Sequence, residues 1–168
     1  MKIETQTTEP LTRLGEALKS HRVAMLTLKD RDGDLHSRPM TPLEMDSQGG
    51  IWFMASRNTM VAALGGTGTT GVSVNLAFAR HDESDYISIH GTARAVDDAQ
   101  RKQQLWSAMA RPWFEGPEDP DLILVEVKPV HAEVWDGPDS TAIRLLAMAA
   151  SIVAGHEVGL GHKEEIRT

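Results

Sequence analysis

A series of turn and strand signals in the first third of the chain most limits how these 168 residues can fold. The apolar stretch Val23 to Leu28 is followed by Asp30-Arg31-Asp32-Gly33, which is typical of a hairpin turn, and then by a return strand from Leu35 to Met40. A second turn at Gln48-Gly49-Gly50 precedes another apolar strand, Ile51 to Ala55. The sequence therefore predicts consecutive antiparallel strands joined by short turns.

The rest of the chain adds strands with helices between them. Alternating patterns predict strands over Val72 to Phe78 and over Tyr86 to Val96, the second with a bulge at Gly91, and a long bent strand from Leu122 to Trp135. Helices are predicted at about Glu9 to Ser20, capped by Thr8, at about Asn58 to Leu64, from a cap at Asp97 or Asp98 through Leu105 and Met109, and at about Thr141 to Ala154. About six mostly antiparallel strands with peripheral helices indicate a small, mainly β barrel rather than a doubly wound sheet.

Length and composition favour one domain with its own core. Hydrophobic residues make up 40% of the chain, and we expect residues 1–168 to form a single unit with a flexible N-terminus (1–8) and a C-terminal tail (155–168). No apolar run approaches the roughly 20 residues that span a bilayer, and the N-terminus has no signal-peptide core. Since cysteine is also absent, a cytoplasmic protein is expected, with no membrane partner.

Charge and motif spacing disfavour two other classes of function. The formal net charge is −7 and the basic residues are scattered singly, so a nucleic-acid partner is not expected. The seven histidines show no spacing typical of a metal site, and none is predicted. Residues Gly66 to Gly71 fit the letters G-x-G-x-x-G, but a helix precedes them and a strand follows, the reverse of the order in dinucleotide-binding folds.

The segment from His36 to Ser56 is predicted to form the wall of a ligand pocket. Arg38 offers a guanidinium to an anion, while Met40, Trp52 and Phe53 offer soft or flat apolar surface. This combination suits a planar ligand that carries a phosphate.

Two further tryptophans are candidates for ligand or interface contacts. Trp113 lies in a proline-flanked loop and Trp135 at a strand end, positions where aromatic residues often serve such contacts. Simple packing remains an alternative for each, and it stays open whether Trp113 reaches the site of a partner subunit.

Five ordered segments carry a resemblance to a known family: RVAMLTLKDRDGDLHSRPM, IWFMAS, YISIHGTARAVDD, LWSAMARPWFEGPEDPDL and AEVWDGP. In these segments the chain resembles the pyridoxamine 5′-phosphate oxidase-like flavoproteins, and more closely their bacterial general stress protein branch. The resemblance implies a six-stranded antiparallel split β-barrel that forms a homodimer, with FMN held in grooves at the subunit interface.

The resemblance also implies which residues hold FMN. Arg38 matches an arginine at the phosphate, the segment from Pro39 to Thr41 matches the strand that meets the ring system, and Trp135 matches a tryptophan near the flavin. The whole expected cofactor set is Arg38, Pro39, Met40, Thr41, Met54, Ala55, Ser56, Arg57, Met60 and Trp135.

The chain departs from the family pattern at two places. Relatives carry a lysine at about Met60 or Val61 that pairs with the phosphate, and here Arg57 is expected to replace it or FMN affinity to be reduced. The R-x-H substrate signature near the C-terminus is replaced by WDGPDSTAIR, so true pyridoxamine phosphate oxidase activity is not expected.

The function implied is that of an FMN-binding stress protein and flavin-dependent oxidoreductase, whose substrate, redox partner and catalytic residues the sequence does not identify. The alternatives are a non-catalytic flavin sensor or carrier, and a split barrel that binds another cofactor such as the deazaflavin F420 or haem.

Overall fold

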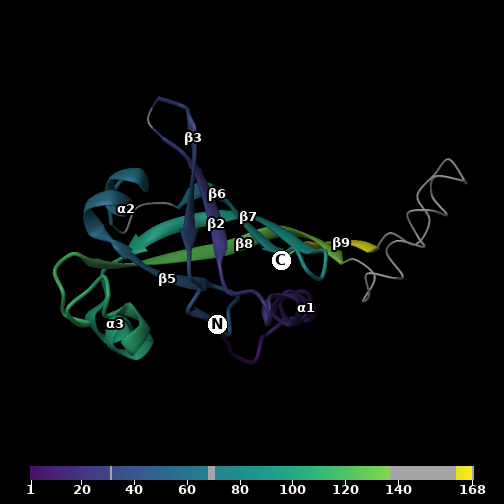
Figure 1. Ribbon diagram of the computed structural model, residues 1–168, viewed down its shortest axis with the longest axis horizontal. Helices are drawn as coiled ribbons and strands as arrows, with labels where there is room; N and C mark the ends of the chain where they lie inside the picture. The colour runs from purple at the N-terminus through teal and green to yellow at the C-terminus, as the bar shows by residue number, and fades with distance from the viewer. Residues whose placement is uncertain (31, 68–70, 137–161, 168) are drawn as a thin grey trace, which may run out of the picture.

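The computed structural model describes residues 1–30, 32–67, 71–136 and 162–167, and a curved, largely antiparallel sheet forms its centre (Figure 1). The main strands of this sheet are β2 (Ala24–Lys29), β3 (Leu35–Met40), β5 (Ile51–Ser56), β6 (Val72–Arg80), β7 (Asp85–Val96) and β8 (Leu122–Asp136). The order across the sheet is β1-β4-β5-β8-β7-β6-β2-β3, and β9 pairs with β8 beside this path. The six antiparallel strands that the sequence predicts are therefore present.

The first hairpin forms as expected. In the register of β2 and β3, Leu26 lies opposite Arg38. The turn is closed by Asp30, whose Oδ1 accepts hydrogen bonds from the backbone N–H groups of Asp32 and Asp34, each at 2.9 Å. Gly33 has a φ of +94°, a conformation that favours glycine. Local turn chemistry thus fixes the direction in which β3 runs.

The core lies on the inner face of the sheet and under the first helix. On β2, Ala24, Leu26 and Leu28 are buried, whereas the residues between them are partly or fully exposed. Helix α1 (Glu9–Leu18) adds one apolar stripe to the same core, formed by Leu11, Leu14 and Leu18. The Oγ1 of Thr8 accepts a hydrogen bond from the backbone N–H of Leu11 and caps the helix, as predicted.

The other two helices lie at the end of the molecule opposite α1 (Figure 1). They are α2 (Arg57–Ala63) and α3 (Ala99–Leu105). The prediction that α3 continues to Met109 is wrong: the backbone is extended at Trp106, and a separate 3-10 turn covers Ala108–Ala110. Leu105 is the last buried residue of α3, so no apolar face remains to stabilise further helical turns. No helix among the described residues is long and apolar enough to cross a membrane.

Short strands lie near both ends of the described chain. Within residues 1–8, β1 (Lys2–Ile3) pairs in parallel with β4 (Glu44–Met45), and Nζ of Lys2 lies 2.9 Å from Oε2 of Glu44. Within residues 155–168, β9 (His162–Arg167) pairs with β8 along its length. The helix predicted over residues 141–154 lies outside the described residues.

Candidate functional site

A cavity of about 560 Å³ lies between the ends of β3 and β5. In the described part of the chain these strands do not pair with each other, because β3 pairs with β2 whereas β5 pairs with β4 and β8. We call one side of the cavity the strand wall; its members come from these two strand ends and are Pro39, Met40, Thr41, Met54, Ala55 and Ser56. The backbone N–H of Leu43, also in the lining, donates to the carbonyl of Trp52 at 2.8 Å and holds the exit of β3 beside β5.

A second group of lining residues, which we call the loop wall, comes from the segment after α3 and comprises Ser107, Met109, Ala110, Trp113 and Phe114. Its backbone is fixed by hydrogen bonds, since the N–H groups of Trp113 and Phe114 both donate to the carbonyl of Ala110, at 3.0 and 3.1 Å. Phe114 is buried and anchors the segment. In contrast, the side chains of Met109 and Trp113 are 78% and 75% exposed. The loop wall therefore presents two large apolar groups to solvent from a fixed backbone.

A hydrogen-bonded turn follows the loop wall. The carboxylate of Asp119 accepts from the backbone N–H groups of Glu115 at 2.9 Å and of Asp121 at 2.8 Å. These two donors stabilise the charged form and hold the pKa of Asp119 below its usual value. The turn positions Asp121 at the edge of the cavity.

The cavity is mainly apolar. Of the described residues that line it, Asp121 alone is ionisable; hydroxyl groups come from Thr41, Ser56 and Ser107. Oδ1 of Asp121 accepts from the backbone N–H of Asn58 at 3.3 Å. The volume falls in the range of about 300 to 1,000 Å³ that is usual for small-molecule sites. No group of three or more acidic or histidine side chains in the described part is arranged to bind a metal.

Comparison with known proteins identifies the family. The model of the family "Pyridoxamine 5'-phosphate oxidase like" matches residues 9–159. The chain belongs to this family. Its fold is the mainly β split barrel of the pyridoxamine phosphate oxidase-like proteins, as the sequence predicted.

Members of the family that resemble this chain include stress proteins. It is 35% identical to the general stress FMN/FAD binding protein of Xanthomonas citri, whose crystal structure superimposes with a TM-score of 0.65 and covers 80% of this chain and 93% of that one. It is 28% identical over 60 residues to general stress protein 26 of Bacillus subtilis, a match that spans 36% of this chain and 43% of that protein. It is 24% identical to protein bli-3 of Neurospora crassa, over 94% of this chain and 79% of that protein.

The structure brings together six of the ten residues expected to hold the cofactor. These six are the members of the strand wall. Arg38, Arg57, Met60 and Trp135 do not line the cavity. Each of these four residues lies in a different place in the structure.

Arg38 lies beside the strand wall on β3, half-buried and opposite Leu26. Among the described residues, no ion-pair partner is found for its guanidinium. Its position next to Pro39 leaves a cation close to the cavity.

Arg57 is engaged elsewhere. Its Nη2 lies 2.5 Å from Oδ2 of Asp97, and its Nε donates to the carbonyl of Pro120 at 2.9 Å. Lys102 donates to the other oxygen of Asp97 at 2.7 Å. The hydrogen bonds from Lys102 and Arg57 hold the pKa of Asp97 below its usual value. The structure thus gives Arg57 a structural task, whereas the sequence suggested a replacement for the missing lysine.

Met60 belongs to the hydrophobic core. Its side chain is 1% exposed and packs in the main cluster of buried residues. The family's lysine was expected at about this position, but a charged side chain at Met60 would point into the core.

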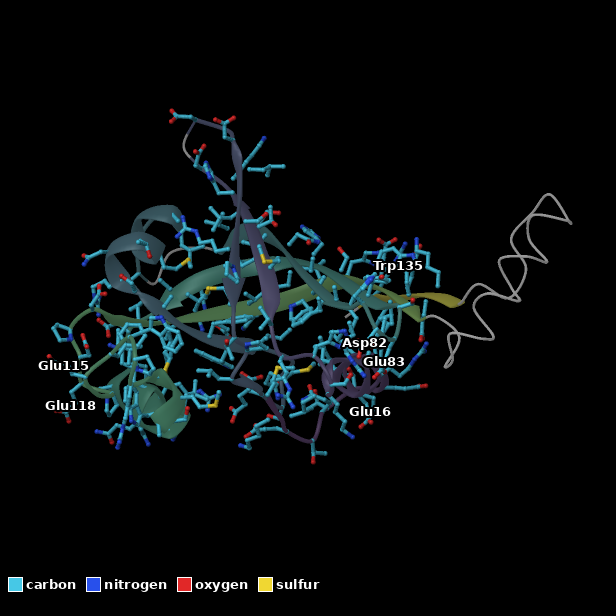
Figure 2. The ribbon with its side chains drawn as sticks, in the orientation of Figure 1. Glu16, Asp82, Glu83, Glu115, Glu118 and Trp135 are labelled. Atoms are coloured by element: carbon cyan, nitrogen blue, oxygen red, sulfur yellow. The ribbon has the colours of Figure 1, made fainter. Side chains whose placement is uncertain are left out.

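Trp135 lies at the far end of β8. Ser56 of the strand wall pairs with Leu122 at the start of β8, and Trp135 comes thirteen residues later, roughly 40 Å along a strand. Figure 2 shows Trp135 at the opposite end of the molecule from Glu115 and Glu118, which follow the loop wall. Within one chain Trp135 therefore cannot reach the cavity.

Sequence reasoning missed the loop wall as a part of the site. The one signal was Trp113, an aromatic residue in a loop flanked by prolines. The sequence contained no indication that the Trp113 loop would fold over the ends of β3 and β5.

Proposed function

We propose that the chain binds FMN in this cavity and acts as a flavin-dependent oxidoreductase of the general stress type. One observation carries the proposal: the two segments at which the family resemblance expects FMN, residues 39–41 and 54–56, line the same cavity although they come from strands that do not pair in the described structure. The general stress FMN/FAD binding protein of Xanthomonas citri, 35% identical, supports a flavin as the ligand.

The residues present fit this cofactor. The apolar strand wall suits a flat ring system, and its hydroxyl groups from Thr41 and Ser56 can bond polar edges. Arg38, beside this wall, would hold the phosphate because a guanidinium binds phosphate through paired hydrogen bonds. When bound, the flavin supplies the electron-transfer chemistry, while the protein binds it, orients it and limits access of water.

The proposal includes a homodimer. Because Trp135 lies roughly 40 Å from the strand wall along β8, it can contribute to a cavity only if a second copy presents it there. The outer face of the sheet offers a surface for that copy: Met25, Ala77, Ala79 and Tyr86 are exposed on neighbouring strands. Exposed apolar residues that adjoin one another are typical of an interface.

Subunit complementation tests this arrangement. R38A and W135A chains are mixed, unfolded and refolded together, and bound FMN is measured. In a mixed dimer one site combines the intact Arg38 of one chain with the partner subunit's Trp135, so about one quarter of all sites should bind FMN normally. Mixing either variant with the double variant R38A/W135A is the control and should restore nothing. Equal FMN binding in both mixtures would contradict the shared site.

The function itself is tested on the purified protein. We expect a flavin absorption spectrum, and we expect the flavin released by heat to be FMN. Under anaerobic conditions, bleaching of this spectrum by NADH or NADPH would support an oxidoreductase. A protein that purifies without flavin and does not take up added FMN would contradict the proposal.

A non-catalytic flavin carrier or sensor is the second candidate. It is favoured by the lining, in which Asp121 is the one ionisable group among the described residues and already accepts a backbone hydrogen bond. Such a protein would bind FMN without turnover of NADH, NADPH or pyridoxine phosphate.

A further inference from the structure

We propose that the loop wall, and above all Trp113, selects the second ligand of this site, and that this ligand is a planar, largely apolar molecule without an anionic group. The inference rests on the proposed function, because it assigns the strand wall to the flavin and leaves the loop wall for the molecule that exchanges electrons with it. To the proposed function, the inference adds the chemical class of that molecule and the residue that recognises it.

Two large apolar side chains of the loop wall are exposed. Met109 and Trp113 are 78% and 75% exposed, although both line the cavity. Their backbone is held in place: Trp113 and Phe114 donate to the carbonyl of Ala110, and Phe114 is buried. A fixed backbone that presents an indole and a thioether to an open cavity is suited to contact with a flat ring, because both groups pack on ring faces and edges.

The described lining of the cavity offers no cation. Asp121 is the one ionisable residue among those described around the cavity. Arg57, which donates its backbone N–H to the carbonyl of Asp121, has its guanidinium bonded to Asp97 and Pro120. Arg111 lies on the same segment as the loop wall but is not part of the lining. An anionic second ligand would therefore find a carboxylate and no cation in the described lining, and Arg38, the cation beside the cavity, adjoins the strand wall.

The strand wall and the loop wall line one cavity. A volume of about 560 Å³ is in the middle of the range for small-molecule sites and is lined by both walls together. The two walls differ in the groups they present: the strand wall carries the hydroxyl groups of Thr41 and Ser56, whereas the loop wall carries one hydroxyl group, that of Ser107, beside the exposed side chains of Met109 and Trp113. Two ligands of different chemistry can thus be recognised at one site.

The test compares a neutral and an anionic molecule that share one ring. FMN-loaded protein is titrated by calorimetry with 1,4-naphthoquinone and with 1,4-naphthoquinone-2-sulfonate. Both probes are oxidised, as is the FMN, so no electrons move and binding alone is measured. The chain has no cysteine, so addition of a thiol to the quinone ring does not interfere. We expect the neutral probe to bind at least about tenfold more tightly than the sulfonate.

The variant W113A tests whether Trp113 is the residue that binds the neutral probe. It should weaken binding of 1,4-naphthoquinone about tenfold, while the FMN dissociation constant and the melting temperature stay close to those of the wild type, because the side chain is largely exposed. The matched control is L35A, which removes another exposed apolar side chain, at the start of β3 and outside the cavity lining, and should change neither affinity.

Three results would overturn the inference. The sulfonate could bind as tightly as the neutral probe, or W113A could leave naphthoquinone affinity unchanged. W113A could also turn a dimeric protein into a monomer, which would mean that a second copy covers Trp113. In all three cases wild-type FMN binding is intact, and the proposed function stands. Absence of FMN binding by the wild type would overturn both proposals together.

Discussion

Arg57 and Asp97 form an ion pair that joins two separate parts of the site's framework. Arg57 Nη2 lies 2.5 Å from Asp97 Oδ2, and the same guanidinium donates through Nε to the carbonyl of Pro120. Asp97 precedes α3, Arg57 begins α2, and Pro120 belongs to the turn that follows the loop wall. The pair therefore holds the ends of two helices and the loop together, and it neutralises a cation that could otherwise have served a phosphate.

Replacing Asp97 by asparagine tests this pair through pH. Hydrogen bonds from Lys102 and Arg57 lower the pKa of Asp97 in the folded state. A carboxyl group whose pKa is lower in the folded state stabilises the fold at a pH above its unfolded-state pKa. This stabilisation is lost as the pH falls through the folded-state pKa. D97N should therefore melt a few degrees below the wild type at pH 7, and the difference should shrink as the pH falls below about 4.

The matched control for D97N is E118Q, which changes an exposed carboxylate on the turn after the loop wall. Its melting temperature should follow that of the wild type across the same pH range. Equal melting temperatures of D97N and wild type at pH 7 would show that the pair does not stabilise the fold.

Two arginines of the expected cofactor set should differ in their effect on FMN. R38A should weaken FMN binding by about 2–3 kcal/mol, because it removes a charged donor to the phosphate. R57A should lower the melting temperature but change the FMN dissociation constant less than about threefold, because its guanidinium is bonded to Asp97 and Pro120. Riboflavin, which lacks the phosphate, is the control ligand: R38A should bind it as well as the wild type does. A larger loss of FMN affinity in R57A than in R38A would reverse the assignment.

A lysine at Met60 should not restore the family's phosphate contact. Because Met60 is 1% exposed and packs in the core, M60K would bury an ammonium group and should destabilise the protein by about 3 kcal/mol or more. M109K, the same substitution at a side chain that is 78% exposed, should change the melting temperature little. A stable M60K protein that binds FMN more tightly than the wild type would show that this side chain can reach the phosphate.

The bulge at Gly91 gives a prediction about the sheet. The pairing of β7 with β8 shifts register between His90 and Gly91, and a Cβ at Gly91 would lie 2.4 Å from the carbonyl oxygen of Lys128. G91A should therefore cost about 1–3 kcal/mol of unfolding free energy in urea denaturation. G116A is the control, since a Cβ there meets no atom of the described residues within 4 Å. Equal stability of the two variants would contradict the close approach.

Most of the barrel could be predicted because its signals are local. The Asp30 turn and the alternating burial on β2 depend on neighbouring residues, and Gly91 stood out as a glycine within a strand pattern. Strand β1, in contrast, is two residues long, and β9 has Ile166 as its one buried residue among those described. Both exist only because they pair with strands far away in the sequence, which no periodicity reveals.

The site, too, has a part that could be predicted from the sequence and a part that could not. The strand wall was expected from the resemblance, because the residues that form it are contiguous in two short segments. The task of Arg57 and the burial of Met60 depend on how α2 packs against Asp97, Pro120 and the core, and no short sequence window contains those partners. The loop wall could not be placed for the same reason, since residues 107–114 meet the strand ends only in the folded chain.

Titration of the cofactor-free protein with FMN, followed by quenching of flavin fluorescence, tests the central claim most directly. The cavity between β3 and β5 predicts saturable binding of one FMN per chain with a dissociation constant of about 1 µM or lower, weakened in R38A. No saturation up to about 100 µM, or equal binding by wild type and R38A, would contradict an FMN site built from these strand ends and Arg38.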